Sequence, residues 1–253
     1  MARHARAAFR WLASGPQLNQ LARLAPILHL IQETGGSELL DAGSGSRGAA
    51  PWLPGWTVTA LDSTFDDYGA ASGPRRRMAQ PVVGDIRAMP FADAGFDVVL
   101  ALDVLEHLAP KDRSVALGEL ARVTRRRLVV ACPAGSQALE ADRRLSRTLP
   151  RPPGWLTEHL DNGFPEPREL VEALESHGRV RLFPNEHVDS HERLVRAELT
   201  LLPALVLRVA ALALSPALRA AGPARGLADR ALLAVRGRDR PPAYRAIVVL
   251  DRT

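Results

Sequence analysis

A short stretch near residue 40 combines an apolar run, an acid and closely spaced glycines. Glu38–Asp41 is predicted to be a strand ending in an acid, and Gly43, Gly45 and Gly48 follow it directly. Glycine has no Cβ, so it can take a positive φ and let a ligand approach the main chain. Amides at the start of a following helix would face the polar part of that ligand. The stretch therefore predicts a site for a nucleotide-like cofactor.

Two cofactor classes fit this stretch. The spacing Gly43-x-Gly45-x-x-Gly48 matches the dinucleotide fingerprint, and Asp62 follows near the expected distance. The same residues fit the Asp-x-Gly-x-Gly turn that is typical of S-adenosylmethionine (SAM)-dependent enzymes of class I. An ordinary glycine-rich turn between a strand and a helix is the third interpretation, so the choice depends on the rest of the chain.

The acid that ends the second predicted strand is a candidate ribose ligand. Thr57–Leu61 is an apolar run followed by Asp62. A carboxylate there can accept hydrogen bonds from both ribose hydroxyls, which explains why nucleotide-binding folds use it. The alternative is that Asp62 caps the next turn.

The order of the next motifs decides between the cofactor classes. Gly84–Asp85–Ile86 precedes Met89–Pro90–Phe91, then Phe96–Leu100 begins a strand, and Asp103–Leu108 reads D-V-L-E-H-L. In this order the chain resembles class I SAM-dependent methyltransferases of the type 11-like family. The dinucleotide-binding fold does not require these motifs in this order.

The resemblance implies SAM as the cofactor and assigns expected roles to several residues. Asp85 is expected at the adenine amino group, Ile86 in the adenine pocket, and Asp103 near the methionine end. Asp41 is expected to act through the turn or on the cofactor ammonium. The expected cofactor-binding residues are Asp41, Gly43, Gly45, Asp62, Asp85, Ile86 and Asp103.

Candidates for the catalytic chemistry are fewer. His107 and His159 are possible general bases, because imidazole titrates near neutral pH. Each also has an interpretation as a packing or hydrogen-bonding residue. The seven histidines are scattered and Cys132 is the only cysteine, so the sequence suggests no metal site.

The sequence predicts only the chemical class of the methyl acceptor. The motif Asp/Asn-Pro-Pro-aromatic, which is found in many methyltransferases acting on amino groups, does not follow the fourth predicted strand, where Asp103–Glu106 stands. A small-molecule, lipid or saccharide acceptor is therefore favoured. Arg47 replaces the third glycine of the common turn, and it either contacts the cofactor carboxylate or is exposed. A catalytically inactive SAM-binding partner protein is thus one alternative, and an NAD-dependent oxidoreductase is another.

The candidate site residues lie far apart in the sequence. A fold in which strands alternate with helices would bring them together at one edge of a sheet. Short apolar runs predict strands at 38–41, 57–61, 81–83, 96–101, 127–131 and 179–183, with an antiparallel last strand at 243–250. The expected fold is α/β, a Rossmann-like doubly wound sheet, mostly parallel. Prolines leave the first crossover helix short or irregular. The predicted units are an N-terminal helical lip (1–36), a SAM-binding core (37–188), a helical insertion (189–242) and the last strand (243–253).

Both helical additions have apolar faces. In the lip, Leu18, Leu21, Leu24, Ile27, Leu28 and Ile31 recur at helical spacing, and Pro16 and Pro26 predict two short helices. In the insertion, Leu199–Leu214 is too short for a membrane span. Its packing against the core is favoured over a dimer face or peripheral membrane contact through 197–215. Packing would turn Leu199, Leu202, Leu205, Val206, Val209 and Leu212 inward.

The charge and the cysteine content indicate which binding partners and which cellular compartment to expect. The net charge is +5 and the sequence pI is near 10.4, but Lys111 is the only lysine. The clusters Arg75–Arg77 and Arg125–Arg127 are not interleaved with aromatic residues, as they would be in a single-strand binder. We therefore expect no nucleic acid partner. One cysteine excludes an internal disulfide and favours a cytoplasmic setting.

Overall fold

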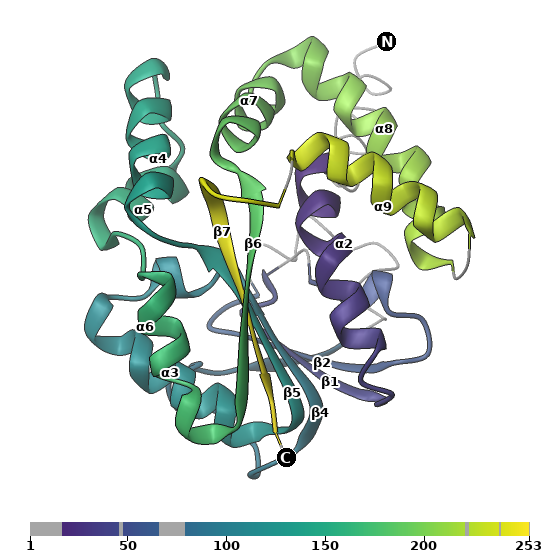
Figure 1. The fold of residues 1–253 in the computed structure, drawn as a ribbon, viewed down its shortest axis with the longest axis vertical. Coiled ribbons are helices and arrows are strands. Elements are labelled where there is room, and N and C mark those ends of the chain that lie inside the picture. Colours follow the sequence, from purple (N-terminus) through teal and green to yellow (C-terminus); the bar gives the residue numbers. More distant parts are fainter. Residues whose placement is uncertain (1–16, 46–47, 66–78, 221–222, 238, 253) are drawn as a thin grey trace.

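The computed structural model describes residues 17–45, 48–65, 79–220, 223–237 and 239–252, which form one sheet with helices on both faces (Figure 1). The strands in spatial order are β3 (Gln80–Val83), β2 (Thr57–Asp62), β1 (Glu38–Ala42), β4 (Phe96–Leu102), β5 (Thr124–Pro133), β7 (Ala243–Asp251) and β6 (Arg179–His187). Neighbours are parallel from β3 to β5, and β7 is antiparallel to both β5 and β6. The predicted fold is confirmed, including the antiparallel last strand.

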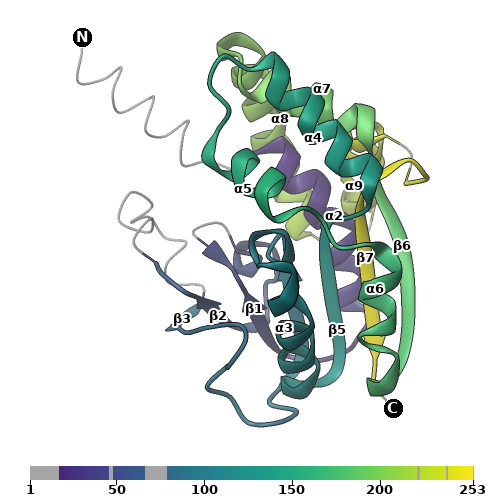
Figure 2. The same cartoon turned by 90° about the vertical axis from the view of Figure 1, so that its left-hand side faces the viewer.

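Helices cover the sheet in two layers and add a cap at one end. The α-helices are α2 (Leu18–Gln32), α3 (Pro110–Val123), α4 (Ser136–Thr148), α5 (Gly154–Asn162), α6 (Pro167–Glu172), α7 (Val188–Glu198), α8 (Leu201–Arg219) and α9 (Pro223–Arg236). One face carries α2, α8 and α9, and the other carries α3 and α6 (Figure 1). Figure 2 shows α4, α5 and α7 gathered at one end of the molecule. That end is the carboxyl edge of the parallel strands, because β6 leads directly into α7.

Alternating strand residues create the two cores. Leu39 and Val98 pack in the core beneath α2, and the next residues, Leu40 and Val99, pack in the core beneath α3. All four side chains are buried. This follows from the period of two in a strand, and it explains why strands covered on both faces are continuous apolar runs.

The helix α2 runs through a proline, so the prediction of a break at Pro26 is wrong. An internal proline costs roughly 3 kcal/mol because it removes one backbone hydrogen bond and crowds the preceding turn. The six leucine and isoleucine side chains predicted for this face are all buried. Each buried side chain of this size stabilises the fold by about 1.5–3 kcal/mol, so their burial outweighs the proline. Pro16 lies outside the described residues.

The first crossover after β1 contains little helix, as predicted. Its described part forms only a short 3-10 helix, η2 (Ala50–Trp52). Trp52 is buried in the core beneath α2. The glycine turn is therefore connected to a compact loop, and the helix N-terminus expected to receive a ligand is replaced by that loop.

The helix α8 packs in a different register from the predicted one. Leu202 is 73% exposed, Val206 68% and Val209 58%. The buried positions are instead Ala211, Ser215 and Leu218, which face α2, α9 and η2. The prediction is wrong because a helix that is apolar all round gives no contrast from which a buried face can be chosen. The window Leu202–Arg219 is long and apolar enough to cross a membrane, and only 17% of it is buried.

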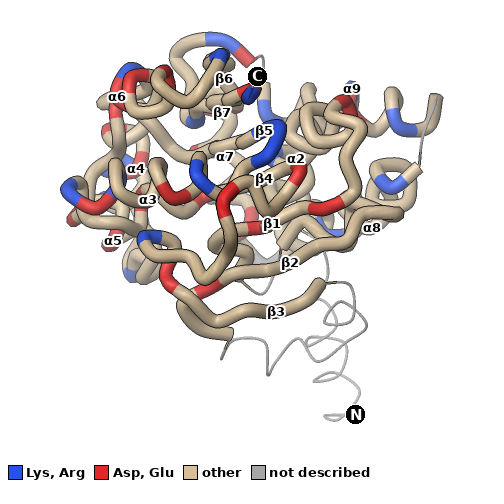
Figure 3. Tube along the Cα trace, turned by 90° about the horizontal axis from the view of Figure 1, so that it is seen from below, with Lys and Arg blue, Asp and Glu red and all other residues tan. Residues whose placement is uncertain are grey.

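Arginine clusters are paired with acids along the described chain. Arg125 and Arg126 contact Asp97 at 3.0 and 3.4 Å, and Arg127 donates to Asp251 at 2.6 Å. Figure 3 shows basic and acidic segments interspersed on the side that it presents, whereas α8 is mostly uncharged. Arg75–Arg77 lies outside the described residues.

Candidate functional site

The glycine turn after β1 needs two backbone conformations that favour glycine. Gly43 has φ +75° and Gly45 has φ +52°. A Cβ on Gly43 would lie 2.3 Å from Cγ2 of Val104, so this position also needs glycine for packing. A Cβ on Gly45 would meet no described atom within 4 Å. Of these two glycines, Gly45 alone combines the left-handed conformation with open space for a ligand.

The carboxyl group of Asp41 is buried beneath the glycine turn. Its Oδ2 accepts a hydrogen bond of 2.6 Å from the amide of Ala49. Burial raises the pKa of Asp41 to about 6, opposed by the Ala49 hydrogen bond and assisted by the negative charge of Asp62. Among the described residues this carboxylate has no ion-pair partner, and a buried carboxylate of this kind favours the approach of a positive group.

Asp62 ends β2 and reaches the same turn. Its Oδ2 accepts a hydrogen bond of 2.8 Å from the amide of Gly45, and its Oδ1 accepts from the amide of Thr64 at 3.3 Å. Asp62 can therefore cap the next turn and still bind a ribose. Each carboxylate oxygen has a second lone pair, which can accept a hydrogen bond from a ribose hydroxyl.

Asp85 follows β3 and forms an ion pair that the sequence did not predict. The guanidinium of Arg87 donates to both carboxylate oxygens at 2.6–3.1 Å. Hydrogen bonds from this guanidinium, and then from the Arg87 amide, lower the pKa of Asp85. The neighbouring Ile86 is buried. Asp85 thus presents a charged carboxylate beside an apolar side chain.

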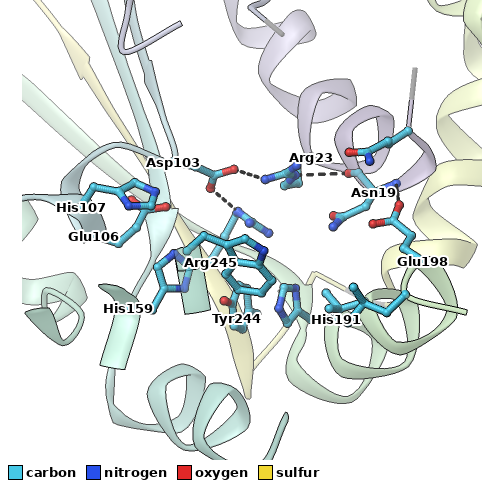
Figure 4. Close-up of a pocket in the computed structure, with 14 residues that line it drawn as sticks. Asn19, Arg23, Asp103, Glu106, His107, His159, His191, Glu198, Tyr244 and Arg245 are labelled. Atoms are coloured by element: carbon cyan, nitrogen blue, oxygen red, sulfur yellow. Dashed lines mark hydrogen bonds and ion pairs between the residues drawn. The ribbon is translucent and has the colours of Figure 1, made fainter. Parts of the chain in front are cut away.

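Three cavities meet at the carboxyl edge of the sheet. The first, here the edge groove, has a volume of about 550 Å³ and is lined by Gly43, Asp62, Asp85, Ile86, Asp103 and His107, among others. The second, the recess, has about 150 Å³ and includes Asp41, Gly43 and Asp103. The third, the polar cavity, has about 380 Å³ and includes Arg23, Asp103, His107, His159, Glu198 and Arg245 (Figure 4). Gly45 lines none of these three.

Asp103 stands where the three cavities join. It takes a positive φ of 54°, and its carboxylate accepts from Nη1 of Arg23 and from Nε of Arg245, the latter at 2.8 Å. Burial by itself would raise the pKa of Asp103, but the charges of Arg245 and Arg23 outweigh it and lower the pKa to about 2. Figure 4 shows this carboxylate between the two guanidinium groups. Asp103 is thus a fixed negative charge shared by all three cavities.

Each predicted catalytic histidine is held by a carboxylate. Nδ1 of His107 lies 2.8 Å from Oε2 of Glu158, and Nδ1 of His159 lies 2.7 Å from Oδ2 of Asp142. The two imidazole ring centroids are 5.4 Å apart. The structure therefore brings His107 and His159 together in the wall of the polar cavity, although they are far apart in sequence.

Buried acids surround this pair. Glu106 is 1% exposed, and its Oε2 has no hydrogen-bond partner among the described residues. Burial and then the charge of Asp103 raise the pKa of Glu106 well above its usual range. The hydroxyl of Tyr244 donates to Asp142 at 3.0 Å.

Residues 40–132 match the model of a protein family described as "Methyltransferase domain". This part of the chain is a methyltransferase domain. The match covers β1 through β5, the part that carries the glycine turn, the acids after β2 and β3, and Asp103. No curated protein sequence matches the chain.

Solved structures share the fold of this methyltransferase. A possible histamine N-methyltransferase from Thermotoga maritima has a TM-score of 0.56 at 13% identity, covering 99% of this chain and 97% of its own. A putative methyltransferase from an antibiotic biosynthesis pathway of Anabaena variabilis has a TM-score of 0.55 at 16% identity, covering 93% and 98%. Magnesium protoporphyrin IX methyltransferase from Synechocystis, with bound SAH, has a TM-score of 0.50 at 17% identity, covering 65% and 76%.

The cofactor of this methyltransferase is SAM, and the residues at the edge groove suit it. The groove carries the three carboxylates of Asp62, Asp85 and Asp103, and Ile86 gives it an apolar wall. Outside the groove, Gly45 offers open space beside a left-handed backbone. Arg47, the departure from the common turn, lies outside the described residues.

Several charged residues of the site were not predicted from the sequence. Arg245 is a charged side chain in the otherwise apolar run Ala243–Leu250, which is a visible signal for an inward-facing ion pair. Arg23 and Glu198 come from α2 and α7 and gave no comparable signal. Their role depends on contacts between segments far apart in the chain.

Proposed function

We propose that this methyltransferase transfers the methyl group of SAM to a small-molecule, lipid or saccharide acceptor that binds in the polar cavity. The observation that carries the proposal is that the edge groove and the polar cavity share Asp103 and His107. A cofactor in one cavity and an acceptor in the other would thus approach each other beside these two residues. Transfer in line requires such an arrangement.

The proposed cofactor residues are those that the sequence predicted. Asp62 would hold the ribose, Asp85 and Ile86 the adenine, and Asp41 and Asp103 the methionine end. Gly43 and Gly45 would allow the close approach of the cofactor to the backbone. SAM, when bound, supplies a methyl group already activated by its sulfonium, so the chain must orient, exclude water and accept a proton.

The lining of the polar cavity favours an acceptor with a polar reacting group. It includes Arg23, Arg245 and Glu198 beside the two histidines. A hydroxyl or amine there would find both donors and acceptors of hydrogen bonds. His107 and His159 are the proposed proton acceptors, because each is oriented through Nδ1 by a carboxylate, which leaves Nε2 for the substrate.

We also propose how the chain divides into structural units and in which cellular compartment it acts. Residues 37–188 would form the SAM-binding core, 1–36 a lip, 189–242 a helical insertion and 243–253 the last strand. A cytoplasmic setting and an acceptor that is not a nucleic acid complete the proposal. Leu199 lies on the rim of the polar cavity and is 51% exposed, which favours peripheral membrane contact through 197–215.

The cofactor half is tested by calorimetry with SAM. Replacing Asp62 by Ala should weaken SAM binding by roughly 1.5–3 kcal/mol, the scale of hydrogen bonds to a charged group. His177→Gln serves as the control, because η6 (Glu175–His177) lies before β6 at the other end of the sheet. Equal SAM affinity in a folded Asp62→Ala variant removes Asp62 from the site.

The acceptor half is tested by transfer of an isotopically labelled methyl group to separate small-molecule, lipid and saccharide fractions. The wild-type protein should label one fraction, and His159→Gln should reduce that labelling while SAM affinity stays unchanged, because His159 lines the polar cavity and not the edge groove. Labelling of none of the fractions, with SAM bound normally, would contradict the proposed acceptor class.

A further inference from the structure

Three side chains in the wall of the polar cavity direct polar atoms toward one another. One candidate ligand atom from each of Glu106, His107 and His159 lies within 4.8 Å of those of the other two. Figure 4 shows Glu106 and His107 adjacent, with His159 close by. The first two belong to η5 (Leu105–His107), and the third belongs to α5, so two separate elements form the cluster.

The histidines are held as metal-binding histidines usually are. Glu158 and Asp142 accept from Nδ1 of His107 and His159, at 2.8 and 2.7 Å. A carboxylate on one ring nitrogen fixes the tautomer and orientation and makes the other nitrogen a better ligand. Nε2 is therefore the nitrogen that each ring can offer to a cation.

One oxygen of the cluster's carboxylate has no hydrogen-bond partner among the described residues. Glu106 is 1% exposed, and its Oε2 makes no hydrogen bond to any described residue. Arg23 and Arg245 donate to Asp103, and Arg245 also donates to Glu186, but neither donates to Oε2 of Glu106. A buried carboxyl group that is left unsatisfied is costly, and a cation beside it would remove that cost.

We propose that Glu106, His107 and His159 bind one divalent transition-metal ion, of the Mn²⁺, Fe²⁺ or Zn²⁺ class. Two imidazoles and one carboxylate suit these ions, whereas Mg²⁺ and Ca²⁺ prefer oxygen ligands alone. Three protein ligands leave coordination positions open, and the cluster lines the polar cavity. The inference rests on the proposed function in one respect, namely that an oxygen of the acceptor would occupy an open position.

Metal binding and general-base catalysis exclude each other at the same nitrogen. A bound Nε2 has no lone pair with which to take a proton. The metal would therefore replace the base role proposed above for His107 and His159, and the acceptor would be oriented by coordination. No local motif indicates this site, because His159 comes from α5, which is distant from η5 in the chain.

The test measures metal binding directly, in protein without a histidine tag and without SAM. Calorimetry with Mn²⁺ and visible absorption with Co²⁺ should report one site per chain. His107→Gln and Glu106→Gln should each weaken Co²⁺ binding at least tenfold. Glu158→Gln changes an exposed outer partner, and it should weaken binding by about 10–100-fold without disturbing the core. His177→Gln should bind Co²⁺ as the wild type does.

The outcomes separate this proposal from the proposed function. Absence of Mn²⁺ heat and Co²⁺ absorption in the wild type overturns the metal site, and so does unchanged binding in both His107→Gln and Glu106→Gln. Calorimetry with SAM on the same metal-free protein tests the cofactor half independently. A protein that binds Co²⁺ but no SAM would contradict the proposed function and retain the metal site.

Discussion

Asp41 illustrates how the burial of a single carboxyl group makes stability depend on pH. Its carboxyl group is buried beneath the glycine turn, and burial raises its pKa from 3.8 to about 6. Between these two values the folded protein holds a proton that the unfolded chain releases. This group therefore favours folding below about pH 4, and its contribution is lost as the pH rises through 6.

Replacing Asp41 by Asn should stabilise the protein without cofactor at neutral pH. The amide oxygen can still accept from Ala49, and the buried charge is gone, so we expect a gain of about 1–3 kcal/mol above pH 6 that vanishes near pH 4. Urea unfolding at both pH values measures it. The exposed Asp161→Asn is the control and should change stability by less than about 0.5 kcal/mol. If Asp41 faces the cofactor ammonium, the same Asp41→Asn variant should also bind SAM more weakly. A variant that is less stable than the wild type at pH 7.5 would show that the buried charge of Asp41 does not destabilise the protein.

At the scale of elements, the glycine turn can be tested with a matched pair. Gly45 and Gly55 both have positive φ, and a Cβ on either would meet no described atom within 4 Å. Alanine at each should cost about 1–2 kcal/mol of stability, because both backbones are left-handed. Only Gly45→Ala should also weaken SAM binding, since a side chain there would occupy the proposed cofactor space. If calorimetry finds the same SAM affinity in both variants, Gly45 does not contact the cofactor.

The elements were predictable from the sequence to the extent that their signals are local. The strands were found because buried strands are short apolar runs, and the acids Asp62 and Asp85 were found because they follow such runs. The fixed direction of parallel strands then brought their ends together. Each of these inferences uses only neighbouring residues.

Features that depend on distant contacts were not predictable in this way. Asp103 was expected near the cofactor, but its partners Arg23 and Arg245 come from α2 and β7. The helix α2 continues through Pro26 because of what it buries, which propensity alone does not show. The register of α8 was wrong because its sequence is apolar on every side. In each case the missing information was the packing partner.

The whole molecule presents an unusual surface next to the polar cavity. Leu202, Val206 and Val209 form an exposed apolar stripe along α8, and Leu199 connects it to the cavity rim. Isolated exposed leucines are ordinary, but a continuous stripe of this kind marks an interaction surface. Arg196 lies in the last turn of α7 and Arg208 lies on α8, so basic residues accompany the stripe, as they do in helices that rest in a membrane interface.

We expect the purified protein to float with vesicles that contain anionic lipid, and Leu202→Glu/Val206→Glu to abolish this binding. Two charges in the stripe would have to enter the headgroup region beside acyl chains, which should reduce partitioning at least tenfold. SAM affinity should be unchanged, because both side chains point away from the core. Val115→Glu is the matched control, since Val115 is an exposed apolar residue too, at 51%, but lies on α3, on the other face of the sheet. A wild-type protein that stays with the vesicle-free fraction and sediments as a dimer, which the double substitution dissociates, would assign the stripe to a second copy of the chain.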